Sequence, residues 1–340
     1  MPDMEGADVT RTARSYWLRE PGSGELRRSE LPDPGPADVL VRAVVSGVSR
    51  GSESLVFRGG VPESQYAVMR APFQEGELPG PVKYGYLSVG VVEAGPDDLC
   101  GRTVFCLHPH QTSYVVPAEA VFVVPDGVPA RRAVLAGTVE TAVNALWDAR
   151  PLVGDRVAVV GAGMVGCCTA RLLAGIPGVE VTLVDAVAER ADTAAALGVG
   201  FALPHQAAGD LDLVVHTSGT GAGLQCALDL LGADGVVTDL SWYGDTPVAL
   251  DLGSRFHSAR LGVRASQVGE VAAARRSRRT RADRMRLALR LLADPAYDAL
   301  LTGESPFAEL PEVMAKLASG SLPALCHTIN YPGDADESEA

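Results

Sequence analysis

The sequence predicts an α/β protein in which a doubly wound parallel sheet is joined to a separate β-rich domain. Residues 14–125 carry short β-rich stretches punctuated by Gly and Pro, whereas strands alternate with helices after Pro151. The length of 340 residues also exceeds what one hydrophobic core usually contains. We therefore expect two domains.

The first domain is predicted to span residues 1–148 and to form a β-barrel. Its β-rich stretches cover residues 39–48, 86–95, 103–107 and 112–125. Turn residues separate these stretches at the spacing that is typical of barrel-like domains. Residues 131–149 then favour a helix, because Pro129 stands just before a run of helix-forming residues.

The second domain is predicted to span residues 149–292. Expected strands cover residues 156–163, 180–185, 211–219, 235–240 and 260–267. Expected helices cover residues 164–173, 186–197, 223–231 and 281–292. Strands that alternate with helices in this way favour a parallel sheet with crossover helices. Residues 293–332 are expected to return to the first domain, and the small, acidic residues 333–340 to form a disordered tail.

The composition disfavours several classes of partner. The net charge of −13 opposes binding to nucleic-acid phosphates, and no run of about 18 apolar residues predicts a membrane helix. The polar, acidic N-terminus lacks the layout of a secretory signal. None of the six cysteines forms a C-x-x-C pair, so we expect free thiols in a cytoplasmic protein.

The most specific motif is G-A-G-M-V-G, which begins at Gly161 directly after an apolar strand and opens a helix. Gly161 permits a tight turn, Gly163 lets the backbone approach a pyrophosphate, and Gly166 lets the helix pack on the sheet. Met164 and Val165 begin the helix, whose free N–H groups favour phosphate. The motif therefore predicts a Rossmann dinucleotide site.

The next strand ends in Asp185, which lies 24 positions after Gly161. A carboxylate at this place accepts hydrogen bonds from the adenosine ribose and repels a 2′-phosphate, so it favours NAD over NADP. Arg190 follows five residues later and would weaken that preference. Thr217 and Ser218 end a later strand, where small residues let the backbone approach the cofactor or simply form a turn.

The order of these features resembles the medium-chain dehydrogenase/reductase superfamily, which includes the alcohol dehydrogenases. The resemblance covers residues 14–331, and its landmarks lie at residues 46–54, 82–95, 101–105 and 114–127 and at the glycine motif. It implies a GroES-like barrel beside the Rossmann domain, and a small-molecule substrate. Dimers are common in this superfamily, and an exposed sheet edge favours pairing, so we expect a homodimer.

The sequence departs from the zinc-bearing members of that superfamily. The position of their ligand Cys holds Ser49, the position of their ligand His holds Tyr86, and the proton-relay Ser or Thr is Gly51. The lobe of four cysteines is absent. Glu140 aligns with a ligand carboxylate of polyol-type members, but a catalytic zinc needs three protein ligands. The resemblance therefore implies a zinc-free branch and no metal.

Within the superfamily, the likeness is greatest to bacteriochlorophyllide-type secondary-alcohol dehydrogenases. These carry a similar G-(I/V)-S-x-G-(S/T)-E stretch and a G-Y-E-S-V-G-like landmark, where this chain has Leu87 in place of the glutamate. The likeness implies conversion between a hydroxyl and a ketone.

Five residues are candidates for the acid–base chemistry: Tyr86, Glu140, His108, Ser49 and Glu53. Tyr86 is either a phenol that donates to the substrate oxygen or a packed barrel tyrosine. His108, with the neighbouring His110, is either a proton shuttle or part of a surface turn shaped by Pro109. Each carboxylate could carry a proton, and Ser49 could bind substrate or simply replace a cysteine.

An arginine-rich stretch stands out in so acidic a chain. Arg275, Arg276, Arg278 and Arg279 precede the expected helix 281–292. Arginine presents a fork of donors to phosphate or carboxylate, so the stretch either recognises an anionic substrate group or forms a solvated helix start or oligomer contact.

Together these patterns predict a zinc-independent, NAD(H)-dependent oxidoreductase that acts on a secondary alcohol or ketone. One alternative is an NAD(P)H reductase of activated double bonds, and another is a non-catalytic dinucleotide-binding protein. An enzyme that uses bound NAD for internal redox without net turnover also fits the pattern. The sequence does not separate these alternatives.

Overall fold

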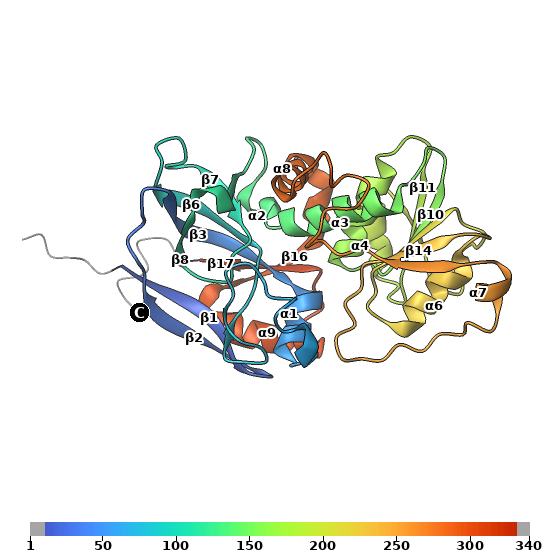
Figure 1. Cartoon of the computed structure of the whole chain (residues 1–340), viewed down its shortest axis with the longest axis horizontal. Helices are drawn as coiled ribbons and strands as arrows, with labels where there is room; N and C mark the ends of the chain where they lie inside the picture. Colours follow the sequence, from blue (N-terminus) through green and yellow to red (C-terminus); the bar gives the residue numbers. More distant parts are fainter. Residues whose placement is uncertain (1–10, 332–340) are drawn as a thin grey trace, which may run out of the picture.

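The computed structural model describes residues 11–331. Along its longest axis the molecule divides into a β-rich part and an α/β part, with helices α3 (Ala136–Ala149) and α8 (Arg281–Leu291) between them (Figure 1). The predicted α/β fold, with a doubly wound parallel sheet beside a β-rich domain, is confirmed. The predicted tail at residues 333–340 lies outside the described residues.

The β-rich part contains two sheets, with strand orders β16-β17-β3-β6-β7-β9 and β2-β1-β5-β4, and β8 pairs with β3. The bounds are β1 Thr12–Glu20, β2 Ser23–Glu30, β3 Asp38–Ser49, β4 Glu75–Gly76, β5 Val82–Lys83, β6 Ser88–Ala94, β7 Thr103–Cys106, β8 Ser113–Pro117, β9 Val121–Val123, β16 Leu301–Pro306 and β17 Cys326–Asn330. Strand β17 pairs antiparallel with β3, with Cys326 opposite Ser49. Strands β16 and β17, from the C-terminal segment, therefore belong to the same sheet as β3, the long strand of the first domain.

Helices and short turns complete this part. They are α1 Arg50–Phe57, η1 Glu63–Gln65, η2 Ala118–Ala120, α2 Ala130–Ala133, η3 Pro295–Leu300, η4 Phe307–Glu309 and α9 Leu310–Ser319. Helix α1 begins directly where β3 ends, so the residues of this corner are fixed by both elements. The single helix expected over residues 131–149 is divided into α2 and α3 by the fully buried Val134 and Leu135.

The α/β part is a six-stranded parallel sheet of order β12-β11-β10-β13-β14-β15. Its elements are β10 Arg156–Val160, α4 Met164–Ala174, β11 Glu180–Val184, α5 Arg190–Ala196, β12 Gly200–Ala202, β13 Leu213–His216, α6 Gly221–Leu230, β14 Val236–Asp239, α7 Arg255–Ser258 and β15 Gly262–Ala265. The strand order reverses between β10 and β13, and ligands of doubly wound sheets bind at such a switch point.

The loop after β14 belongs to the α/β part and packs against the β-rich part. Trp242 packs against the hydrophobic cluster that contains Leu55 and Val61, and the Asp245 N–H donates to the Gly60 carbonyl over 2.9 Å. The carboxyl end of the parallel sheet is therefore held beside α1. Between residues 11 and 331, every helix is too short or too polar to cross a lipid bilayer.

Candidate active site

The glycine motif forms a turn between β10 and α4 that fits a pyrophosphate. Gly161 adopts a φ of 108°, which favours glycine, and a Cβ atom there would lie 2.6 Å from the backbone nitrogen of Ser218. Gly163 is the N-cap of α4, has no side chain to cap it, and has no atom within 4 Å of its Cβ position. The first N–H groups of α4, from Met164 and Val165, thus adjoin open space.

Polar side chains on both sides fix this turn. Asp185, at the end of β11, accepts hydrogen bonds from the Ala162 N–H over 2.7 Å and from the Val187 N–H over 2.9 Å. On the other side, the Thr217 hydroxyl donates to the Gly161 carbonyl over 2.8 Å. Asp185 and Thr217, both predicted from the sequence, are therefore brought together at the glycine turn.

Arg50 is a residue of this site that sequence reasoning missed. Burial lowers the pKa of Arg50, and the positive charge of Arg190 lowers it further. The negative charge of Asp185 raises the pKa of Arg50 and so offsets part of this shift. Arg50 begins α1 in the β-rich part, so its charge interacts with Arg190 and Asp185 across the junction. The only available signal was its place directly after Ser49, within the first landmark.

Tyr86 and Ser49 form a hydrogen-bonded pair at the corner of β3 and α1. The Tyr86 hydroxyl donates to the Ser49 hydroxyl oxygen over 2.7 Å. Burial raises the pKa of Tyr86, and the negative charge of Glu53 raises it further. The phenol therefore stays protonated near neutral pH and acts as a hydrogen-bond donor.

A buried glutamate–histidine pair lies next to the Tyr86–Ser49 pair. Glu53 Oε2 lies 2.9 Å from His110 Nε2, and Glu53 Oε1 accepts the Ser49 N–H over 2.7 Å. His110 Nδ1 lies 2.7 Å from the Ser46 hydroxyl, which is 2.9 Å from the Tyr331 hydroxyl. We call Glu53, His110, Ser46 and Tyr331 the Glu53–His110 network. Sequence reasoning missed Ser46 and Tyr331, since neither lies in a motif that predicts this contact.

The structure does not join His108 to this network. Its ring stacks on Tyr114 with 3.8 Å between ring centroids, and Nδ1 lies 2.9 Å from the Pro109 carbonyl oxygen. Burial and the charge of Lys83 lower the pKa of His108 to about 3. His108 is therefore a neutral, packed ring near neutral pH.

Glu140 lies in the interface of α3 and α8. Its carboxylate accepts a hydrogen bond from Arg284 Nε over 3.0 Å, and Arg284 also donates to the Asn144 side chain and to the Glu270 carbonyl. Burial raises the pKa of Glu140, and Arg284 partly offsets the shift. Arg284, which is 1% exposed, was not singled out from the sequence.

The arginine-rich stretch lies on the exposed side of the α3–α8 interface. Arg275, Arg276, Arg278 and Arg279 are all exposed to solvent. A surface pocket of about 270 Å³ is lined by Trp147, Arg275, Arg279, Asp283, Leu287 and Arg290. Its lining includes neither the glycine turn nor the Tyr86–Ser49 pair. Over residues 11–331, no group of three or more His, Cys, Asp or Glu side chains is arranged to hold a metal ion.

Comparison with known proteins identifies the fold. No protein-family model matches the chain. The starvation-sensing protein RspB of Escherichia coli K12 is 26% identical over 212 residues, which cover 56% of this chain and 62% of RspB. The match thus spans less than two thirds of that relative's length.

Two solved structures cover 94% of this chain and 99% of their own, each with a TM-score of 0.74 and 17% identity. One is the short chain alcohol dehydrogenase rspB from E. coli CFT073, complexed with NADH. The other is a dehydrogenase described as zinc-binding from Sinorhizobium meliloti 1021, bound to NADP. The chain has the fold of these dehydrogenases. At this level of identity the likeness establishes the fold alone, so the chemistry has to be argued from this chain's own residues.

Proposed function

We propose that this protein is a zinc-independent, NAD(H)-dependent oxidoreductase that moves a hydride between the nicotinamide and a secondary alcohol or ketone. The observation that carries the proposal is the Tyr86–Ser49 pair, backed by the buried Glu53 and His110, beside a glycine turn that fits a pyrophosphate. When bound, the cofactor supplies the hydride chemistry, and the protein supplies position and electrostatics.

The cofactor site favours a dinucleotide with an unmodified adenosine ribose. The helix α4 N-terminus at Gly163 would hold the phosphates, and Asp185 would accept from the ribose hydroxyls. Arg50 and Arg190 add positive charge for the phosphates from two sides. Because Asp185 would repel a 2′-phosphate, we propose NAD rather than NADP.

The Tyr86 phenol is the proposed donor to the substrate oxygen, which would replace the Ser49 hydroxyl oxygen as the acceptor of its hydrogen. Its raised pKa keeps it protonated, so it stabilises negative charge that develops on a carbonyl or alkoxide oxygen. Ser49 lies within hydrogen-bond reach of Tyr86 and is fixed by its own N–H bond to Glu53. We propose that the Glu53–His110 pair exchanges protons with this donor, since a carboxylate and an imidazole can each carry a proton and Glu53 is bonded to Ser49.

The donor set argues against zinc at this place. Ser49 and Tyr86 occupy the positions that resemble the ligand positions of zinc-bearing dehydrogenases, and they bind each other. Zinc in proteins takes Cys, His and carboxylate ligands, and the adjacent Glu53 and His110 are already paired. Glu140 is bound to Arg284. These partners support a metal-free reaction in which Tyr86 polarises the substrate oxygen.

The decisive experiment is calorimetric titration with NADH and NADPH, zinc analysis of the same sample, and a screen of secondary alcohols and ketones. The screen pairs neutral substrates with phosphorylated ones to test the arginine-rich pocket. Tyr86→Phe is expected to lower kcat roughly 100-fold and to leave NADH affinity unchanged. Tyr84→Phe is the matched control, because its ring packs against Tyr86 at 6.1 Å between centroids. It should keep kcat within about twofold, the scatter expected of a substitution that removes no catalytic group.

Other outcomes would reject parts of the proposal. Stoichiometric zinc would exclude the metal-free reaction, and preference for NADPH would contradict the role given to Asp185. Tight NADH binding without turnover would favour a non-catalytic dinucleotide-binding protein. Turnover confined to activated double bonds would favour the reductase alternative.

A further inference from the structure

The arginine-rich pocket at helices α3 and α8 is not used by the proposed reaction. Its volume is about 270 Å³. Helix α8 contributes Asp283, Leu287 and Arg290, whose spacing of four and then three residues places them on one face of the helix. The other lining residues are Trp147 of α3 and, just before α8, Arg275 and Arg279.

Apolar side chains from both helices line this pocket. Trp147 and Leu287 are half-buried and pack against the hydrophobic cluster that contains Leu135 and Met285. Packing on a core holds a side chain in place. The part of the indole that lines the pocket therefore offers a flat, fixed apolar surface to a ligand.

The segment that carries Arg275 and Arg279 is anchored to α3. The Ala272 N–H donates to the Asn144 side-chain oxygen over 2.9 Å, and the Arg275 N–H donates to the Ala272 carbonyl over 2.8 Å. The Arg279 N–H then donates to the Arg275 carbonyl over 3.0 Å. Arg275 and Arg279 are thus one helical turn apart, and both line the same pocket.

The pocket carries an excess of positive charge. Within residues 11–331, the guanidinium groups of Arg275, Arg279 and Arg290 make no hydrogen bond or ion pair. The Asp283 carboxylate accepts from the Thr280 N–H over 3.0 Å and from the Thr280 hydroxyl over 2.9 Å. These hydrogen bonds lower the pKa of Asp283, and the charge of Arg279 lowers it further. Three arginines therefore face one ionised aspartate.

The stability of α8 does not explain this arrangement of charge. Cations next to a helix N-terminus are mildly unfavourable, because the helix dipole is positive at that end. Like charges around one pocket also repel each other. A bound anion would relieve both penalties, and a cleft lined by charge of one sign concentrates ions of the opposite sign.

The lining residues fit a small anion with an attached flat group. Guanidinium groups present planar forks of donors that match phosphate oxygens. A phosphate monoester carries close to two negative charges near neutral pH, which balances three arginines and one aspartate. The volume lies near the lower end of the range for ligand pockets, so the ligand is small. The chain's net charge of −13 opposes a nucleic acid at this surface.

We propose that the arginine-rich pocket binds a phosphate monoester that carries a flat apolar group. The three arginines bind the phosphate, and Trp147 packs on the flat group. The lining contains no residue of the glycine turn and neither member of the Tyr86–Ser49 pair. The pocket is therefore a second site, and the inference does not rest on the proposed function.

Calorimetric titration of the full-length protein with phenyl phosphate tests this site. Phenyl phosphate combines a phosphate with a flat ring, whereas inorganic phosphate lacks the ring. The titration compares the wild type with Arg275→Gln, Arg279→Gln and Arg278→Gln at low ionic strength, where charge is least screened. Arg278→Gln is the matched control, because Arg278 is exposed in the same stretch and does not line the pocket. Titration of the same proteins with NADH reports the cofactor site separately.

We expect the wild type to bind phenyl phosphate saturably. Arg275→Gln and Arg279→Gln should each weaken this binding about tenfold, because each removes charge-assisted hydrogen bonds. Arg278→Gln should stay within about twofold of the wild type, since it removes only a solvent-screened charge. Trp147→Leu should weaken the binding of phenyl phosphate more than that of inorganic phosphate, because leucine offers no ring for stacking. NADH affinity should be the same in all of these proteins.

Equal weakening in Arg278→Gln would overturn the proposal, because binding would then depend on the general charge of the stretch. Unchanged affinity in Arg275→Gln and Arg279→Gln would also overturn it, since the anion would then bind elsewhere, such as at the glycine turn. The absence of saturable binding to the wild type would do the same. Weaker NADH binding in either variant would make the arginines part of the cofactor site. Binding of phenyl phosphate with the expected pattern, but not of NADH, would support this pocket and reject the proposed cofactor site.

Discussion

Glu53 and Glu140 are both buried glutamates paired with a basic side chain, yet their surroundings give them different abilities. Glu53 pairs with His110 beside Tyr86 and Ser49, whereas Glu140 pairs with Arg284 between two helices. An imidazole can donate a hydrogen from one ring nitrogen and accept at the other, whereas a guanidinium only donates. The partner, more than the burial, decides whether a carboxylate can take part in proton exchange.

The largest expected effect is on stability at Glu140. Glu140→Ala leaves the Arg284 guanidinium buried without a counter-charge, which should cost about 3–5 kcal/mol of unfolding free energy. Urea denaturation measures the change, and Glu312→Ala serves as control because its side chain is 78% exposed. A stable Glu140→Ala variant that has lost its activity would instead make Glu140 an acid–base residue.

The next effect is on catalysis at Glu53. Glu53→Gln keeps the shape but removes the carboxylate that pairs with His110 Nε2, so we expect kcat to fall about 100-fold. NADH affinity should stay unchanged, because the hydrogen bonds of Glu53 go to Ser49 and His110 and not to the glycine turn. Steady-state kinetics and NADH titration measure both, with the exposed Glu119→Gln as control. Loss of affinity at constant kcat would contradict the role given to the Glu53–His110 network.

Local patterns predicted the contacts around the glycine turn far better than the contacts around Tyr86. The glycine turn, Asp185 and Thr217 follow from strand ends, and the structure brings them together. Glu53 and His110 were each singled out, but their pairing across 57 positions depends on how the sheets pack. The contact between Ser46 and Tyr331 spans 285 positions and exists because β17 pairs with β3.

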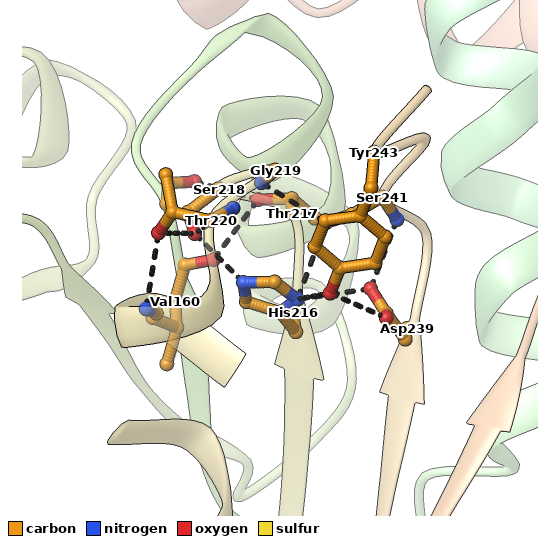
Figure 2. A network of polar contacts seen from close by, with 11 residues as sticks. Val160, His216, Thr217, Ser218, Gly219, Thr220, Asp239, Ser241 and Tyr243 are labelled. Carbon is orange, nitrogen blue, oxygen red and sulfur yellow. Dashed lines mark hydrogen bonds and ion pairs between the residues drawn. The ribbon is translucent and has the colours of Figure 1, made fainter. Parts of the chain in front are cut away.

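The hydrogen-bonded pair of His216 and Asp239 shows the same limit of prediction from local sequence patterns (Figure 2). Residues 216–219 attracted notice for their small side chains, and the histidine itself carried no prediction. His216 pairs with Asp239, which lies opposite it only because β13 and β14 are neighbouring parallel strands. Strand register is a long-range property, so a single sequence without further information does not pair these two residues.

A third prediction compares the neighbouring His108 and His110, of which only His110 has a carboxylate partner. The pKa of His108 is about 3 in the folded protein and about 6.5 in an unfolded chain, so the unfolded state binds more protons between these values. Stability therefore falls as pH drops below the unfolded value, by about 2 kcal/mol from pH 7 to pH 5 for this group. His108→Phe, which keeps a ring against Tyr114, should remove that part of the acid sensitivity in denaturation series. An unchanged pH dependence would contradict the neutral, packed state of His108.

The smallest effect is expected where an ion pair is half-exposed. Arg132 binds Asp298 through two hydrogen bonds, one of 2.7 Å from Nε to Oδ1, but the Asp298 side chain is 54% exposed. The hydrogen bonds from Arg132 lower the pKa of Asp298. A lowered folded pKa stabilises the protein above the unfolded value of about 3.9, and this contribution is lost as pH falls through the folded value.

Solvent screens this pair, so Asp298→Asn should cost less than about 1 kcal/mol, well below the cost at Glu140. The difference in unfolding free energy between variant and wild type should be present at pH 7 and vanish at a pH below the folded value. A difference that persists in acid would show that Asp298 acts through its shape rather than its charge. A loss as large as that of Glu140→Ala would mean that exposure does not weaken an arginine–carboxylate pair here, and the contrast between the buried and exposed pairs would fail.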